Sequence, residues 1–124
     1  MKVLVSGTRR GLNEDILKRS LEYVPVSQDG YTLIHGDCSG IDKQMAKLCD
    51  ERGWRIEPYP ADWHTQGDTG GPIRNTFVVN LNPDFGIFLP DIKSRGTYDC
   101  LNKFRAKGKR GVCYLPKTNT FSTF

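Results

Sequence analysis

Three short loops of this 124-residue chain combine glycine with hydroxyl, carboxylate or guanidinium side chains, each shortly after an apolar run. They lie at residues 6–9, 36–42 and 94–97 and read SGTR, GDCSGID and SRGT. Glycine lets the backbone approach a ligand closely, arginine can bind phosphate through two nitrogens, and the amides of a helix N-terminus can hold an anion. Together the three loops predict binding of a phosphate-bearing, nucleotide-type ligand.

The individual loops leave alternatives open. In the first loop Gly7, Thr8 and Arg9 suit a phosphate, but a tight turn with a solvent-exposed arginine fits this loop equally well. In the second loop Asp42 lies in the first turn of a predicted helix, where it either caps that turn or binds a ribose hydroxyl. Neither G-x-G-x-x-G nor the P-loop pattern occurs, so standard dinucleotide or ATPase chemistry is not indicated.

A fourth segment, Gly70–Asn75, overlaps the end of an irregular stretch at 60–72 and places Arg74 in the first turn of a predicted helix. A cation at that position opposes the helix dipole. This unfavourable placement suggests an anion held between Arg74 and the helix amides, although an arginine that points to solvent also fits the pattern.

Further side chains near these loops suit a sugar or a nucleobase. Asp62 is a second candidate for a ribose hydroxyl, and Trp63 or Tyr98 could stack on a base. The predicted ligand-binding residues are Ser6, Gly7, Thr8, Arg9, Gly36, Asp37, Ser39, Gly40, Asp42, Asp62, Trp63, Arg74, Asn75, Ser94, Arg95, Gly96 and Thr97.

Alternating strand and helix patterns position these loops. Apolar runs predict strands at 3–6, 31–35, 54–59, 85–89 and 112–115, and helical spacing predicts helices at 13–24, 41–49, 72–81 and 97–107. This order predicts an α/β fold, a Rossmann-like three-layer α/β/α sandwich with a mainly parallel five-stranded sheet. The site is then expected at the carboxyl edge of the sheet. We expect one domain over residues 1–116 and a polar C-terminal tail over 117–124.

Composition limits the partners. The chain has 18 basic and 14 acidic residues, a net charge of +4 that favours an anionic ligand only mildly. The densest basic stretch, at 105–110, fits a helix end better than a DNA contact, so we expect no nucleic-acid partner. The four cysteines match no metal-binding spacing, and no signal or membrane-spanning segment is evident. We therefore expect a cytoplasmic protein with free thiols and neither a metal nor a cofactor.

The motifs at residues 3–9, 36–42, 59–63, 71–75 and 95–99 resemble the YspA (cpYpsA-related) branch of the SLOG superfamily, which is related to the LOG and DprA proteins. The resemblance implies a Rossmann-like fold and binding of a nucleotide-derived molecule, of the ADP-ribose or NAD type or a nucleoside monophosphate, by a sensor or sequestering domain. Many members occur in phage genomes and mobile elements. Relatives in the superfamily often form homodimers or larger homo-oligomers, which makes such an assembly possible here.

LOG proteins suggest an alternative function, because they are phosphoribohydrolases that remove the base from a nucleoside 5′-monophosphate. By similarity, Arg74 matches their signature arginine, with Asn75 in place of lysine, and Ser94 replaces a signature glycine. Their final glutamate falls on Cys100, which leaves Asp99 beside it. Arg74 and Asp99 are thus the catalytic candidates of this alternative, but a thiol cannot replace the carboxylate. The resemblance therefore favours binding over hydrolysis.

Overall fold

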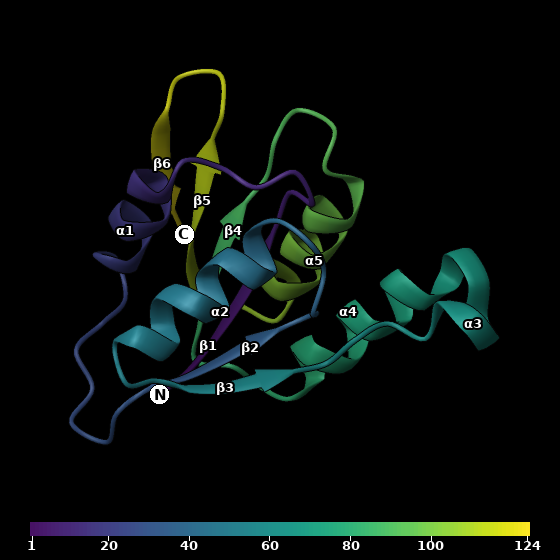
Figure 1. Cartoon of the computed structure of the whole chain (residues 1–124), viewed down its shortest axis with the longest axis horizontal. Helices are drawn as coiled ribbons and strands as arrows, with labels where there is room; N and C mark the ends of the chain where they lie inside the picture. The colour runs from purple at the N-terminus through teal and green to yellow at the C-terminus, as the bar shows by residue number, and fades with distance from the viewer.

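The computed structural model describes residues 1–124, and strands and helices alternate along the chain as the sequence predicts (Figure 1). The strands are β1 (Lys2–Gly7), β2 (Thr32–His35), β3 (Arg55–Pro58), β4 (Phe85–Leu89), β5 (Arg110–Leu115) and β6 (Thr120–Thr123). The helices are α1 (Glu14–Leu21), α2 (Ile41–Glu51), α3 (Trp63–Gln66), the 3₁₀ turn η1 (Gly67–Thr69), α4 (Gly70–Asn80) and α5 (Arg95–Ala106).

The strands form one sheet in the order β3-β2-β1-β4-β5-β6, with β1 to β5 parallel. Two buried clusters lie on its two faces: α1 and α2 cover one, and α4 and α5 cover the other. The pleat explains this division, because Val3 and Val5 point into the first cluster and Leu4 points into the second. The predicted Rossmann-like three-layer sandwich is therefore confirmed.

The sheet has six strands rather than the predicted five. Part of the segment expected to be a tail, Thr120–Thr123, forms β6 and pairs antiparallel with β5. Phe121 packs against Tyr114 in the first cluster, and Phe124 packs against Phe88 and Phe104 in the second. A polar strand of four residues gives almost no apolar pattern, so the sequence alone did not predict it.

The stretch at 60–72, which the sequence predicts to be irregular, is largely helical. Asp62 caps α3 by accepting a hydrogen bond from the Thr65 amide at 3.1 Å, and α4 begins at Gly70, two residues before Pro72. Gly71 allows the α3–α4 packing, because a Cβ there would lie 2.8 Å from the Trp63 ring. α3 extends away from the sheet at the right of Figure 1. None of the helices is long and apolar enough to span a membrane.

The adjacency of β1 and β4 defines where a ligand would bind. After β1 the chain passes to α1 on one face of the sheet, and after β4 it passes to α5 on the other. The two loops that follow these strands therefore diverge and leave a crevice at the carboxyl edge, where ligands bind in open α/β sheets.

Candidate functional site

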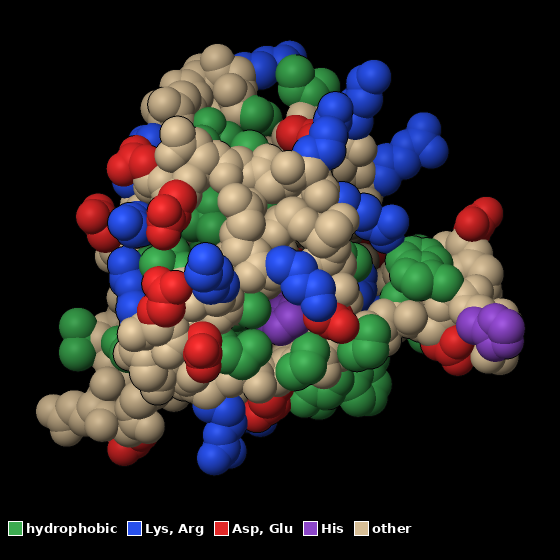
Figure 2. Space-filling view, viewed as in Figure 1, with side chains coloured by type: hydrophobic (Ala, Val, Ile, Leu, Met, Phe, Trp, Pro, Cys, Tyr) green, Lys and Arg blue, Asp and Glu red, His purple; other side chains and the backbone are tan.

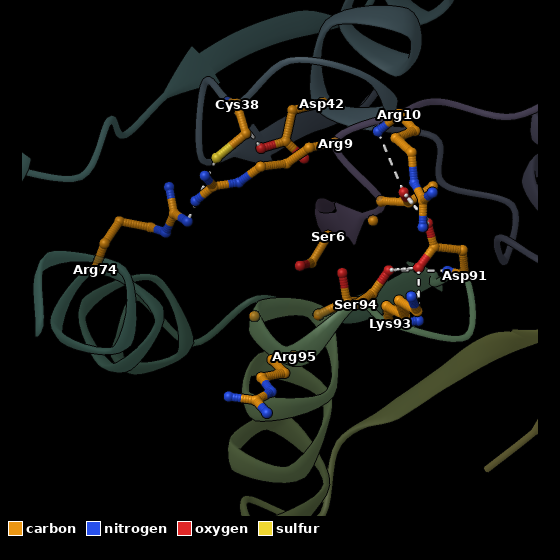
Figure 3. A pocket seen from close by; sticks show the side chains of 14 residues that line it. Ser6, Arg9, Arg10, Cys38, Asp42, Arg74, Asp91, Lys93, Ser94 and Arg95 are labelled. Carbon is orange, nitrogen blue, oxygen red and sulfur yellow. Dashed lines mark hydrogen bonds and ion pairs between the residues drawn. The ribbon is translucent and has the colours of Figure 1, made fainter. Parts of the chain in front are cut away.

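A cavity of ≈290 Å³ lies in this crevice, between the loop after β1 and the loop after β4 (Figure 3). Its lining carries five cationic side chains against two carboxylates. It brings together ten of the residues predicted from sequence: Ser6, Gly7, Thr8, Arg9, Asp42, Arg74, Ser94, Arg95, Gly96 and Thr97. It also includes Arg10, Cys38, Asp91 and Lys93, which the prediction omitted. Asp91 directly follows the predicted fourth strand and Pro90. Its place at the carboxyl end of a strand could therefore have identified it as a site residue.

One side of the cavity is a hydrogen-bonded network in which both oxygens of Asp91 have partners. We call it the Asp91 wall, and it consists of Thr8, Arg10, Asp91, Lys93 and Ser94. Asp91 Oδ2 accepts a hydrogen bond from Thr8 Oγ1 at 2.7 Å and pairs with Arg10 Nη2 at 2.9 Å. Its Oδ1 accepts from Ser94 Oγ and from the Lys93 amide, both at 2.8 Å. These hydrogen bonds, led by the one from Thr8, and the Arg10 charge lower the pKa of Asp91 to about 2. The hydroxyl protons of Thr8 and Ser94 are thus already engaged within the protein.

The opposite side, here called the Asp42 wall, consists of Gly36, Cys38, Asp42 and Arg74. Asp42 Oδ2 accepts from the amides of Gly36 at 3.0 Å and Cys38 at 3.2 Å. Asp42 Oδ1 is buried without any hydrogen-bond partner. Burial raises the pKa of Asp42 to about 6, against the lowering effect of these amides and the Arg74 charge. The wall therefore contains a buried acceptor that the protein itself does not satisfy.

Arg74 braces the second loop. Its Nη1 donates to the Gly36 carbonyl at 2.7 Å, its Nε donates to Asn75 Oδ1 at 3.0 Å, and its Nη2 lies 3.7 Å from Cys38 Sγ. A Cβ on Gly36 would lie only 2.0 Å from Nη1, so glycine is required for this contact. Because α4 begins at Gly70, Arg74 lies in its second turn, and the predicted placement in the first turn is wrong.

The N-terminus of α5 forms the floor between the two walls. Ser94 occupies the N-cap position but makes no capping bond, and the amides of Gly96 and Thr97 donate to no atom of the chain. Nothing lies within 4 Å of a Cβ built on Gly96. Unpaired amides at a helix N-terminus attract anions. Basic side chains also gather over the loop between β4 and α5, as Figure 2 shows.

A second cavity, also of ≈290 Å³, adjoins the first and shares Arg9 and Cys38 with it. Four more predicted residues line it: Gly36, Asp37, Ser39 and Trp63. Gly40 lines neither cavity. It instead allows the first two loops to touch, because its φ is +77° and a Cβ there would lie 2.3 Å from the Thr8 carbonyl oxygen.

Besides Gly40, four of the residues named from the sequence lie outside both cavities: Asp62, Asn75, Tyr98 and Asp99. Asp62 caps α3, and Asn75 donates to the Gly96 carbonyl at 3.1 Å and to Asp99 Oδ2 at 3.0 Å. Asp99 also pairs with Lys103 at 3.0 Å. Cys100 is 1% exposed, and burial raises the pKa of its thiol to about 12. Neither Asp99 nor Cys100 is thus positioned to act on a molecule in the main cavity.

Comparison with known proteins identifies the family. The chain is 28% identical to the Gene 61 protein of Mycobacterium phage D29 over 116 residues, which cover 86% of this chain and 90% of that protein. No solved structure matches. Residues 1–65, which include β1, β2, β3 and the two loops after β1 and β2, match the YspA, cpYpsA-related SLOG family. The chain therefore belongs to the YspA, cpYpsA-related SLOG family.

Proposed function

We propose that the main cavity binds a nucleotide or nucleotide-derived anion and that the protein acts as a sensor or sequestering domain for it. The observation that carries this proposal is the charge of the lining, with five cations against two carboxylates, one of which is saturated in the Asp91 wall. Membership of the SLOG family supports a nucleotide-related ligand.

The proposed roles follow from which groups are unpaired. The amides of Gly96 and Thr97 and the side chains of Arg9, Lys93 and Arg95 bind the phosphate. Asp42 lines the cavity, and its Oδ1, which is buried and unpaired, accepts a hydrogen bond from a ribose hydroxyl once the side chain turns toward the ligand.

The low pKa of Asp91 argues against a general-acid role for that carboxylate, because it stays ionised at neutral pH. His35 is buried at the end of β2, its Nδ1 accepts from the Asp37 amide, and burial lowers its pKa. Neither group is an evident proton donor to a ligand at neutral pH.

The alternative, a LOG-type phosphoribohydrolase, is favoured by one observation: Asp42 borders the cavity with a raised pKa near 6, within the range of a general acid. Incubation with nucleoside 5′-monophosphates and chromatography for free base tests it. Base release that is abolished in Asp42→Asn would support hydrolysis. Absence of free base with every monophosphate would exclude it.

The binding proposal is tested by thermal unfolding in the presence of AMP, ADP-ribose, NAD and inorganic phosphate. We expect at least one nucleotide to raise the Tm of the wild-type protein by a saturable amount. The same nucleotide should raise the Tm of the double variant Lys93→Ala/Arg95→Ala by far less. Lys47→Ala, which removes an exposed cation on α2 that forms no ion pair, should behave like wild type. If no nucleotide shifts the Tm, the proposal is wrong.

A further inference from the structure

Trp63 is an exposed aromatic side chain in a fixed position beside the second cavity. It is 43% exposed, yet its ring packs so closely on α4 that any side chain at Gly71 would collide with it. Asp62 fixes the start of α3 through its bond to the Thr65 amide. Figure 2 shows hydrophobic surface on this projecting unit, which Figure 1 identifies as α3 and the start of α4.

Among the exposed aromatic side chains, Trp63 and Tyr98 have no aromatic partner, and of these two only Trp63 lines a cavity. Trp54 stacks on Tyr31 with a centroid distance of 4.6 Å, and Phe77 packs against Tyr59 at 5.6 Å. The contact recorded for the Trp63 ring face is with the Arg9 guanidinium, 5.1 Å from the ring centroid. An aromatic face that is packed against a helix and covered by an arginine without other side-chain partners is well suited to stacking.

Arg9 connects the two cavities and is held by little else. Its guanidinium forms no ion pair, and none of its nitrogens donates a side-chain hydrogen bond within the chain. By contrast, the neighbouring Arg10 is bound to Asp91 at 2.9 Å. Arg9 can therefore leave the indole for an anion in the main cavity at the cost of one cation–π contact at an exposed site.

We propose that the second cavity is a nucleobase subsite in which a heteroaromatic base stacks on Trp63, in the place that Arg9 vacates when it moves to the phosphate. This inference rests on the proposed function, because it assigns the ribose phosphate to the main cavity. The ligand class is accordingly a nucleoside phosphate, with its base beside Trp63 and its sugar phosphate between the Asp42 and Asp91 walls. Stacking tolerates every base, so Trp63 selects for the presence of a base rather than for its identity.

Calorimetric titration with ribose 5-phosphate and with AMP, GMP, CMP and UMP tests the proposal. Base stacking on an aromatic side chain corresponds to about 5- to 150-fold in affinity. We expect at least one monophosphate to bind about tenfold or more tightly than ribose 5-phosphate to the wild-type protein. Trp63→Ala should reduce that preference to less than about threefold and leave the affinity for ribose 5-phosphate itself within about threefold.

Because the chain has two tryptophans, fluorescence gives a second readout that does not depend on the stability of an alanine variant. In Trp54→Phe, Trp63 is the sole emitter, and the preferred monophosphate should quench it saturably. In Trp63→Phe, Trp54 is the sole emitter and should not respond, because it lies stacked on Tyr31.

The outcomes separate the two proposals. Binding of ribose 5-phosphate without base preference and without quenching of Trp63 would overturn the base subsite and leave the proposed function standing. Absence of binding by all five compounds would overturn both. Tight binding of a monophosphate that quenches Trp63, with ribose 5-phosphate weak or undetectable, would support both.

Discussion

The two walls of the main cavity each centre on an aspartate, and their environments are opposite. Asp91 accepts hydrogen bonds or an ion pair at both oxygens, and its pKa falls to about 2. Asp42 has two amide donors on one oxygen and none on the other, is buried, and has a pKa raised to about 6. A carboxylate whose oxygens are all hydrogen-bonded holds the loops in place, whereas a buried carboxylate oxygen without a donor is an exception that a ligand hydroxyl would explain under the proposed function.

Arg9 and Arg10 repeat this contrast on a single loop. Arg10 is neutralised by Asp91, and Arg9 has only the Trp63 ring as its contact. In both comparisons the paired group contributes to the structure and the unpaired group is available to a ligand. Substitutions that remove a paired group, an unpaired group or the contact between the walls distinguish these roles.

The largest effect is expected at Gly40, which joins the walls because its neighbour Ile41 donates to the Thr8 carbonyl at 3.0 Å. Its φ of +77° and ψ of −124° suit glycine alone, and a Cβ would lie 2.3 Å from that carbonyl oxygen. Gly40→Ala should lower the free energy of unfolding by about 3 kcal/mol or more in urea titrations.

Gly53→Ala is the matched control, because Gly53 also has a positive φ, +83°, but nothing lies within 4 Å of its Cβ position. It should cost only about 1 kcal/mol. Equal losses in the two variants would show that contact between the walls contributes nothing measurable beyond backbone strain.

The next effect is a pH dependence of opposite sign for the two aspartates. The folded pKa of Asp42 is raised, so the folded state binds more protons than the unfolded state between about pH 4 and 6. Wild-type stability should therefore fall as pH rises through this window, by about 2–3 kcal/mol relative to Asp42→Asn.

Asp91→Asn provides the comparison. The folded pKa of Asp91 is lowered, so its contribution is complete above about pH 4 and is lost only as pH falls toward 2. Between pH 4 and 7 this variant should differ from wild type by a constant amount. Urea unfolding midpoints at pH 4.5 and 7 measure the stability difference between wild type and each variant. If the stability of wild type and of Asp42→Asn changed equally between these two pH values, the assignment of a raised pKa to Asp42 would be wrong.

A smaller effect separates the two arginines. Arg9→Ala should weaken AMP binding about tenfold, because it removes a charge-assisted phosphate contact, and should leave the Tm unchanged. Arg10→Ala should weaken AMP binding less than threefold and cost at most about 1 kcal/mol of stability, as expected for an exposed ion pair. Calorimetric titration measures the AMP affinity of both variants, and thermal unfolding measures their stability. If Arg10→Ala weakened AMP binding more than Arg9→Ala did, Arg10 rather than Arg9 would be the arginine that binds the phosphate.

The smallest effect is expected at Asp99, which pairs with Lys103 and Asn75 outside both cavities. Asp99→Asn should change AMP affinity less than twofold and stability by about 0.5 kcal/mol. If wild-type protein released base from a monophosphate and this substitution slowed the release tenfold or more, Asp99 would take the catalytic role that its likeness to the LOG signature suggests.

The sequence predicted the buried strands and the loops that follow them, because continuous apolar runs such as 85–89 and the glycines after them leave strong local patterns. It could not predict β6, since the contacts of Phe121 and Phe124 are made with residues elsewhere in the sheet. It placed Thr8 and Ser94 near the ligand but did not find Asp91, the residue that engages their hydroxyls. Which polar groups stay unpaired is a property of three-dimensional packing, and a one-dimensional pattern does not contain it.

The central claim is that a nucleotide anion binds between the Asp42 and Asp91 walls, at the N-terminus of α5. A titration of ¹⁵N-labelled protein with AMP, followed through the backbone amide resonances, tests it most directly. We predict saturable shifts that are largest for Gly96 and Thr97, whose amides are unpaired, and near zero for Lys47 and Glu51 on α2. Saturable shifts confined to another surface, or no shift at millimolar AMP, would contradict the account.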